Sequence, residues 1–373
     1  MSTRVLVVDD TALVRRIVND ALTGSPGVEI AGAAANGKIA LARLAALHPD
    51  LMTLDIEMPE MDGIEVLQAM SAAGLNTGVI VLSSLTQRGG EMTMRALELG
   101  AFDFLTKPEG GNAEANLSWL REHLAPMIRA FERRREIQNI LRKDARTSPR
   151  VEAPAVPVPA AAIPATAATP AAAAVRRRNG PPMVLIAVST GGPAALAQVV
   201  PALPADLGAP VFIVQHMPAL FTQPLAASLA AKSAMRVKEA ADGEAAEPNC
   251  VYLAPGGSQM KLAPGGRGEV YVRITDDPPE NNCKPAADYL FRSAALNFPG
   301  RAVTAILTGM GNDGTAGLRM LKRGGCLAIA QDEASCVVFG MPKEAIATGL
   351  VDVVAPLEAI AGTIVRSLRE GRK

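Results

Sequence analysis

Short runs of apolar residues alternate with segments of helical periodicity, and this pattern occurs twice along the chain. In the first part the strand-like runs are RVLVVDD, VEIAGAA, LMTLDIEM, GVIVLSS and AFDFLTKP, with helical runs such as TALVRRIVNDALTG between them. In the second part the corresponding runs are MVLIAVS, APVFIVQH, CVYLAPG, EVYVRIT, AVTAILTG and CLAIAQD. Such alternation is typical of a parallel sheet covered by helices on both faces. The pattern predicts an α/β protein with two doubly wound parallel-sheet domains and, within the second, a hairpin over YLAPGGSQMKLAPGGRGEVYVRI.

The domain boundaries follow from a change in composition near the middle of the chain. Residues 145–182 contain the run APAVPVPAAAIPATAATPAAAA, whose Ala/Pro-rich composition does not support a packed core. Residues 114–144 have the pattern of one or two helices. We therefore expect one domain at residues 1–125, a helical extension and Ala/Pro-rich linker at 126–182, and a second domain at 183–373.

Composition narrows the possible functions. Lys+Arg and Asp+Glu balance at 37 each, so the chain offers no overall charge attraction to nucleic acid or to an anionic membrane. The N-terminus is too short and too acidic for a secretory signal, and no apolar run reaches the ~20 residues that span a bilayer. We expect a cytoplasmic protein without membrane insertion. The four cysteines have no metal-ligand spacing and predict reduced thiols: Cys250, Cys283, Cys326 and Cys336.

Polar residues end several strands of the first domain. Asp9 and Asp10 follow the first predicted strand, Asp55 ends the third, Ser83 the fourth and Lys107 the fifth. The carboxyl ends of parallel strands lie along one edge of a sheet, so these side chains should meet there. Three neighbouring carboxylates favour a hard cation such as Mg²⁺, and a lysine can pair with phosphate oxygens. The combination predicts a site that accepts a phosphoryl group; ordinary strand-end acids are the alternative.

The first domain resembles the receiver domain of two-component response regulators, which has a flavodoxin-like fold. The motifs VLVVDD, LDIEMPEMDG, VLSS and FLTKP carry this resemblance over about residues 3–125. It implies that a chemotaxis histidine kinase of the CheA type phosphorylates the acceptor carboxylate. The residues to which the resemblance gives roles are the acceptor Asp55, the Mg²⁺ ligands Asp9, Asp10, Asp55 and the Glu57 carbonyl, the phosphoryl contacts Ser83 and Lys107, and the switch aromatic Phe104.

Three strand ends of the second domain carry a serine, a histidine and an aspartate. Ser189 follows VLIAV, His216 follows VFIVQ, and Asp313 lies in the loop after VTAIL. If these ends gather at one sheet edge, they supply a nucleophile, a general base and an acid that orients the base. Gly191, Gly192 and a helix start near Pro193 would add backbone N–H groups for an oxyanion. The pattern predicts a serine hydrolase, although the GxSxG motif is absent.

Each of these signals also has a structural interpretation. The STGGP segment could form a phosphate-binding turn, His216 could be a structural histidine, and Asp313 could cap a loop. A further alternative is a response regulator whose C-terminal domain is a non-catalytic interaction module. A DNA-binding output domain is disfavoured, because the second half has no helix-turn-helix pattern and no basic excess.

The second domain resembles the CheB family of chemotaxis methylesterases over about residues 183–365. The segments IAVSTGGPAAL, QHMPALFTQPLA, KPAADYLFRSAA and AILTGMGNDGTAGL carry the resemblance. It implies hydrolysis of glutamyl methyl esters on methyl-accepting chemotaxis receptors, with deamidation of some receptor glutamines and no cofactor for the esterase. It also implies that Ser189, His216 and Asp313 are catalytic, with support from Thr190 and the Met310 N–H.

Two further expectations concern regulation and substrate contact. Many relatives have histidine where this chain has Gln259, and we expect that difference to affect substrate contacts more than chemistry. The order of the domains suggests that the unphosphorylated receiver packs over the hydrolase cleft. Phosphorylation of Asp55 would then weaken the docked arrangement.

Overall fold

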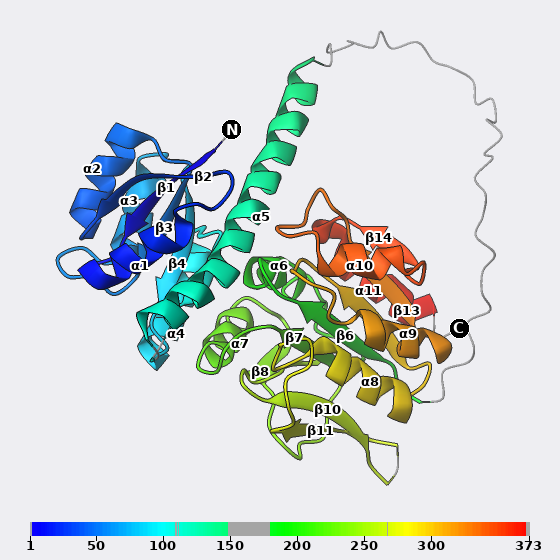
Figure 1. Cartoon of the computed structure of the whole chain (residues 1–373). Coiled ribbons are helices and arrows are strands. Elements are labelled where there is room, and N and C mark those ends of the chain that lie inside the picture. The colour runs from blue at the N-terminus through cyan, green and yellow to red at the C-terminus, as the bar shows by residue number, and fades with distance from the viewer. Residues whose placement is uncertain (1, 109, 111, 148–179, 267, 371–373) are drawn as a thin grey trace, which may run out of the picture.

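The structure is a computed structural model that describes residues 2–108, 110, 112–147, 180–266 and 268–370. The predicted Ala/Pro-rich linker lies almost entirely outside these residues. Two parallel sheets, each covered by helices on both faces, form an N-terminal and a C-terminal domain, as Figure 1 shows. The sequence-based prediction of an α/β fold with two doubly wound sheets is therefore confirmed.

The N-terminal sheet is parallel throughout, with the strand order β2-β1-β3-β4-β5. Its β1 alternates residues between the two faces: Leu6 and Val8 pack with α2 and α3, while Val5 and Val7 pack with α1 and α5. This period of two is what a strand buried on both faces requires. The strands are β1 (Thr3–Val8), β2 (Val28–Ala34), β3 (Leu51–Asp55), β4 (Gly78–Ser83) and β5 (Asp103–Thr106), and the helices are α1 (Ala12–Leu22), α2 (Gly37–Leu47), α3 (Gly63–Ala72), α4 (Gln87–Glu98) and α5 (Ala113–Thr147).

The C-terminal sheet has seven parallel strands in the order β14-β13-β12-β6-β7-β9-β8. Helices α6, α7 and α11 cover one face, and α8, α9 and α10 cover the other. The strands are β6 (Met183–Val188), β7 (Val211–Gln215), β8 (Arg236–Glu239), β9 (Cys250–Leu253), β12 (Ala302–Ile306), β13 (Leu327–Gln331) and β14 (Val353–Ala355), and the helices are α6 (Gly192–Val199), α7 (Thr222–Ala230), α8 (Ala287–Asn297), α9 (Thr315–Arg323), α10 (Met341–Ala347) and α11 (Leu357–Glu370).

The predicted hairpin is present outside the main sheet. Strands β10 (Gln259–Pro264) and β11 (Val270–Thr275) pair antiparallel and form a sheet of their own. The β11–α8 connection then returns the chain toward the carboxyl edge of the seven-stranded sheet. Two short strands of that sheet, β8 and β14, were not among the predicted runs; they lie at its two edges.

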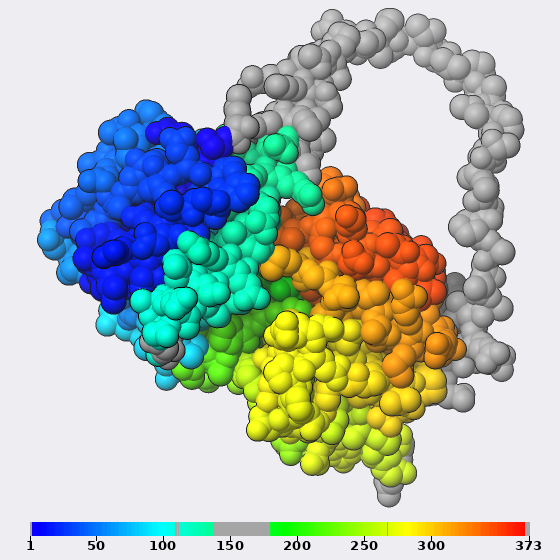
Figure 2. All heavy atoms as spheres, in the orientation of Figure 1, coloured from blue at the N-terminus to red at the C-terminus, as the bar shows by residue number. Residues whose placement is uncertain are grey.

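The two domains contact each other through α4 and the start of β5. Met94 of α4 is buried in a core cluster that otherwise belongs to the C-terminal domain. Phe104 stacks on Phe221, and Glu98 accepts hydrogen bonds from Ser228 and Lys232. Helix α5, 35 residues long, runs along the boundary between the domains in Figures 1 and 2. None of the described helices combines the length and the apolar character that crossing a membrane requires.

Candidate functional site

The three strand ends predicted to form one site do lie side by side. Strands β12, β6 and β7 are neighbours in the sheet, and Val188 pairs with Gln215 at the carboxyl ends of β6 and β7. Ser189 and His216 are each the next residue, and the His216 N–H donates to the Val188 carbonyl over 3.1 Å. Neighbouring strands are separated by about 4.8 Å, and consecutive side chains alternate between faces. Ser189 and His216 therefore occupy matching positions at one edge of the sheet.

The imidazole of His216 is held by Asp313. The distance from His216 Nε2 to Asp313 Oδ2 is 2.7 Å, and both side chains are largely buried. The Asp313 carboxylate also accepts hydrogen bonds from the backbone N–H groups of Ala287 and Asp288 and from the Asn281 amide, at 2.6–3.0 Å. Burial alone would raise the pKa of Asp313, but His216 and these donors hold it below its ordinary value. An ionised Asp313 accepts a hydrogen bond from Nε2–H of the neutral ring and leaves the Nδ1 lone pair for chemistry.

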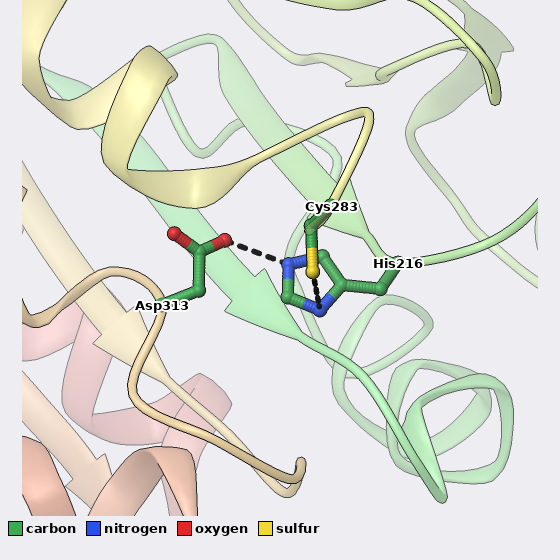
Figure 3. A group of neighbouring side chains, drawn as sticks. All are labelled: His216, Cys283 and Asp313. Carbon is green, nitrogen blue, oxygen red and sulfur yellow. Dashed lines mark hydrogen bonds and ion pairs between the residues drawn. The ribbon is translucent and has the colours of Figure 1, made fainter. Parts of the chain in front are cut away.

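The other ring nitrogen faces a cysteine that the sequence did not connect with the site. His216 Nδ1 lies 3.5 Å from Cys283 Sγ, so Asp313 and Cys283 approach opposite nitrogens of one ring, as Figure 3 shows. Burial lowers the pKa of His216, but the interactions with Asp313 and Cys283 outweigh burial and raise that pKa to about 9. Cys283 belongs to the segment between β11 and α8, and it is partly exposed. Spacing along the chain could not reveal this contact.

Backbone contacts fix the loop that carries Ser189. The Ser189 N–H donates to the Thr308 carbonyl over 3.0 Å, which ties the end of β6 to the end of β12. Gly309 allows this close approach, since a Cβ there would lie 2.8 Å from the Ser189 Cβ. Both Ser189 and His216 are part of the described chain, and no hydrogen bond joins the Ser189 hydroxyl to the imidazole in this arrangement. The proximity of the two residues thus comes from the strand register and not from a side-chain bond.

Gln215 is a positioning residue that the sequence analysis missed. Its side chain is buried, and its Nε2 donates to the Ser189 carbonyl at 3.0 Å and to the His216 carbonyl at 3.1 Å. One amide therefore holds both loops at a fixed separation. A Cβ at Gly192 would lie 1.9 Å from Gln215 Oε1, so only glycine fits beside this amide. Its place immediately before the only histidine of the C-terminal domain is the signal that could have identified it.

The two predicted supporting residues lie on either side of Ser189. Thr190 follows it directly, and its carbonyl accepts a hydrogen bond from the Thr308 hydroxyl. Met310 lies in the loop after β12, next to Gly309, and 45% of its surface is exposed. Their support of the Ser189 hydroxyl stays a prediction.

The side chain of Gln259 is buried and bonded to the segment that carries Cys283. The side chain is fully buried, donates to the carbonyls of Pro278 and Cys283, and accepts from the Ala286 N–H. These hydrogen bonds hold the segment that carries Cys283, and because Gln259 has no exposed surface it does not touch a substrate directly. Any effect of Gln259 on substrate contacts would act through this segment, and that expectation stays a prediction.

The predicted acidic cluster of the N-terminal domain is also assembled. Lys107 Nζ lies 2.8 Å from Asp9 Oδ2 and 2.6 Å from Asp55 Oδ2. Burial raises the pKa of Asp55 to about 6, although Lys107 opposes this shift. Carboxylate oxygens of Asp9, Asp10 and Asp55 lie within 4.8 Å of one another. This hard, oxygen-only donor set beside a lysine fits Mg²⁺.

The other residues predicted for the phosphorylation site, Ser83, Glu57 and Phe104, contact groups outside the acidic cluster. Ser83 is buried, donates to the Gly89 carbonyl and accepts from the Thr93 hydroxyl, so its hydroxyl is bonded to α4. Glu57 is exposed and accepts from the Ser84 hydroxyl. The ring of Phe104 stacks on the ring of Phe221 in the C-terminal domain. The predicted contact of Ser83 with a phosphoryl group would require its hydroxyl to leave α4.

Comparisons with known proteins cover both domains. The CheB methylesterase family model matches residues 184–364, and the response regulator receiver domain model matches residues 5–115. Two curated relatives are named protein-glutamate methylesterase/protein-glutamine glutaminase. The relative from Desulfotalea psychrophila is 46% identical to this chain over 98% of each chain. The relative from Bacillus subtilis is 42% identical to this chain over 99% of each chain. The solved CheB methylesterase catalytic domain of Thermotoga maritima is 40% identical, with a TM-score of 0.49 over 50% of this chain and 99% of that one. The chain belongs to the CheB methylesterase family, with a receiver domain preceding the methylesterase domain.

Proposed function

We propose that this protein hydrolyses glutamyl methyl esters on methyl-accepting chemotaxis receptors, releasing glutamate and methanol. We include deamidation of specific receptor glutamines, since the same attack on a side-chain amide would release ammonia. The observation that carries the proposal is the juxtaposition of Ser189 and His216 at matching strand ends, with Asp313 bonded to the imidazole. The names of the full-length relatives support the same activity over a non-catalytic interaction module.

The contacts of His216 determine which nitrogen acts as the base. Because Asp313 accepts from Nε2–H, the free lone pair belongs to Nδ1. Nδ1 takes the Ser189 hydroxyl proton as Ser189 Oγ attacks the ester carbonyl, and the resulting imidazolium gives that proton to the departing methoxy oxygen, which leaves as methanol. Water then hydrolyses the glutamyl-enzyme with His216 again as the base. This use of the nitrogens is opposite to the familiar triad, in which the aspartate holds Nδ1.

The developing oxyanion needs donors beside Ser189. The backbone N–H of Met310 lies in the loop that Gly309 brings against Ser189, and Thr190 follows the nucleophile on the other side. Donors fixed by backbone contacts stabilise the charge without reorganising during the reaction. We assign Thr190 and Met310 this supporting role.

The receiver domain would take a phosphoryl group on Asp55 from a chemotaxis histidine kinase of the CheA type, in the cytoplasm. Asp9, Asp10, Asp55 and the Glu57 carbonyl would hold Mg²⁺, which neutralises charge on the transferred phosphoryl group. Lys107, already paired with Asp55, would bind phosphoryl oxygens after transfer. Ser83 would supply a further donor once its hydroxyl leaves the Gly89 carbonyl.

We assign the contact between the domains an inhibitory role. Asp103 of the receiver accepts a hydrogen bond from the Gly191 N–H, two residues after Ser189, over 3.1 Å. Phe104 stacks on Phe221, which belongs to the loop that follows His216. The receiver thus contacts both loops that emerge from the proposed active site. Phosphorylation at Asp55 would shift Ser83 and Phe104 and weaken this docking.

Labelling with a fluorophosphonate tests the hydrolase directly. The reagent forms a covalent adduct only with an activated serine, and mass spectrometry locates the adduct. We expect labelling at Ser189 that is lost in His216→Ala and strengthened by a small phosphodonor with Mg²⁺. Equal labelling of His216→Ala and of the unaltered protein would refute the proposed base.

A further inference from the structure

The surroundings of His216 contain a thiol, that of Cys283, for which ester hydrolysis has no use. Cys283 Sγ lies 3.5 Å from His216 Nδ1 and is not on any of the strand ends that build the proposed triad. Ligand atoms of His216, Cys283 and Asp313 lie within 4.8 Å of one another. Histidine nitrogen and cysteine sulfur are the donors that Zn²⁺ prefers in proteins.

We propose that Cys283 Sγ and His216 Nδ1 form a binding site for Zn²⁺ and that the bound ion inhibits the esterase. The inhibitory part of this inference rests on the proposed function, whereas the binding part stands on the geometry alone. The site differs in chemistry from the receiver cluster, because the receiver cluster offers only hard carboxylate oxygens.

The separation of the two donors fits one shared metal ion. With Zn–S near 2.3 Å and Zn–N near 2.0 Å, a tetrahedral Zn²⁺ holds its sulfur and nitrogen ligands about 3.5 Å apart. The observed 3.5 Å from Sγ to Nδ1 equals that spacing. Small movements of either side chain would therefore suffice for both atoms to reach the ion. Two protein ligands leave further tetrahedral positions for water or for the Ser189 hydroxyl.

Asp313 completes the arrangement from the opposite side of the ring. Its Oδ2 lies 2.7 Å from Nε2, so it cannot also ligate an ion at Nδ1. A carboxylate that accepts the second ring N–H is the usual partner of a metal-bound histidine, since it fixes the tautomer and strengthens the other nitrogen as a ligand. The four hydrogen bonds that Asp313 accepts keep that carboxylate in place. The same contact that prepares Nδ1 as a base therefore prepares it as a ligand.

A bound Zn²⁺ would block ester hydrolysis because it competes with the Ser189 proton for His216 Nδ1. A metal-bound Nδ1 has no lone pair with which to take the Ser189 proton. Binding displaces the thiol proton of Cys283 and any proton on His216 Nδ1, so that a thiolate and a neutral imidazole hold the divalent ion. Cys283 is partly exposed, whereas the three other cysteines are buried, so Cys283 is the most open thiol for a metal arriving from solvent.

Cobalt provides a readout that does not depend on activity. Co²⁺ substitutes for Zn²⁺, and a cobalt–thiolate bond gives a charge-transfer absorption in the near ultraviolet that carboxylate ligands do not produce. The full-length protein, with excess Mg²⁺ present to occupy the receiver, is titrated with Co²⁺ and then with Zn²⁺. We expect the band to appear with Co²⁺, to disappear as Zn²⁺ replaces it, and to be absent from Cys283→Ser.

Competition with a chromophoric chelator gives the affinity for Zn²⁺. Loss of the thiolate in Cys283→Ser should weaken binding by more than the ~10–100-fold that removal of an outer-shell partner costs. Asp313→Asn should fall within that smaller range. Cys336→Ala is the matched control: Cys336 is buried, belongs to no described cluster of metal-binding groups, and should leave the band and the affinity unchanged.

Methanol release from a methylated receptor then tests inhibition, each variant being compared with its own rate in EDTA. We expect Zn²⁺ to inhibit the unaltered protein and Cys336→Ala, and inhibition of Cys283→Ser to need at least ~10-fold more Zn²⁺, in line with its weaker binding. Absence of the thiolate band, or its persistence in Cys283→Ser, would refute the proposed metal site. A band without inhibition of methanol release would refute the claim that the bound ion competes with the reaction. A metal-free protein that releases no methanol would instead count against the proposed esterase, while the band would still decide the site.

Discussion

The ring of Phe104 in the receiver stacks on the ring of Phe221 in the catalytic domain, with centroids 5.0 Å apart and planes at 16°. Phe221 is fully buried and lies in the segment between His216 and α7. Phe104 is two residues from the end of a strand whose neighbour ends at Ser83. The pair therefore links the phosphorylation site to the loop that holds the proposed catalytic base.

Phe104→Ala is expected to raise esterase activity in the absence of phosphorylation. An aromatic pair contributes about 0.5–1.5 kcal/mol beyond the area that it buries, so loss of the pair should shift the docking equilibrium by roughly 2- to 13-fold toward the open form. Methanol release without a phosphodonor measures the effect. Leu296→Ala, which truncates an exposed side chain on α8, is the control and should leave the rate unchanged. A lower or equal rate in Phe104→Ala would count against an inhibitory receiver.

Asp103 should make docking sensitive to pH. Burial raises the pKa of Asp103 to about 7, although the Phe104 and Gly191 N–H groups oppose this shift. Separation of the domains exposes the carboxyl and returns its pKa toward ~3.9, so the docked state binds more protons. Docking therefore weakens as pH rises from about 4 to about 7, and above that range Asp103 is ionised in both states and has no further effect.

Asp103→Asn removes this titration while preserving an acceptor for the Gly191 N–H. Between about pH 5 and pH 7, the unphosphorylated activity of the unaltered protein should increase relative to that of the variant, and the ratio should level off above about pH 7. The ratio of the two rates isolates Asp103, because His216 titrates in both proteins. A ratio independent of pH would show that Asp103 does not control docking.

The activated enzyme should gain activity with increasing pH up to about pH 9. The interactions with Asp313 and Cys283 outweigh burial and raise the pKa of His216 to about 9, so the imidazole is mostly charged at pH 7. Only the neutral form can take the Ser189 proton. Asp313→Asn should move the midpoint of the kcat/KM profile to lower pH, besides reducing the maximum rate. A midpoint that stays fixed in Asp313→Asn would contradict this account of the pKa.

Gln215→Leu tests whether one buried amide positions both loops. The substitution nearly preserves volume but leaves the His216 carbonyl without this donor, while the Ser189 carbonyl keeps only the Gly192 N–H. A buried group left unsatisfied costs about 1–3 kcal/mol, so we expect kcat to fall roughly 5- to 150-fold with a smaller change in KM. The control Gln198→Leu alters an exposed glutamine of α6 and should retain the unaltered rate. Equal kcat values in the two variants would exclude a positioning role.

The pattern of strands was enough to predict two parallel sheets, without the edge strands β8 and β14, and to place Ser189 and His216 at one edge, because parallel strand ends share an edge whatever the details of packing. It could not identify Cys283, since that contact depends on how the β11–α8 segment folds back over the sheet. It also could not show that Asp313 takes Nε2 and leaves Nδ1, because ring orientation is set by the donors around the carboxylate. The burial of Gln259 escaped prediction for a similar reason: its partners come from the same returning segment.

Methanol release from a methylated receptor, with and without a small phosphodonor and Mg²⁺, tests the central claim most directly. The unaltered protein should release methanol faster with the phosphodonor, and EDTA should remove that gain. Ser189→Ala should lose several orders of magnitude of turnover under both conditions, as expected for removal of a nucleophile. Methanol release by Ser189→Ala at the rate of the unaltered protein would contradict the proposed mechanism.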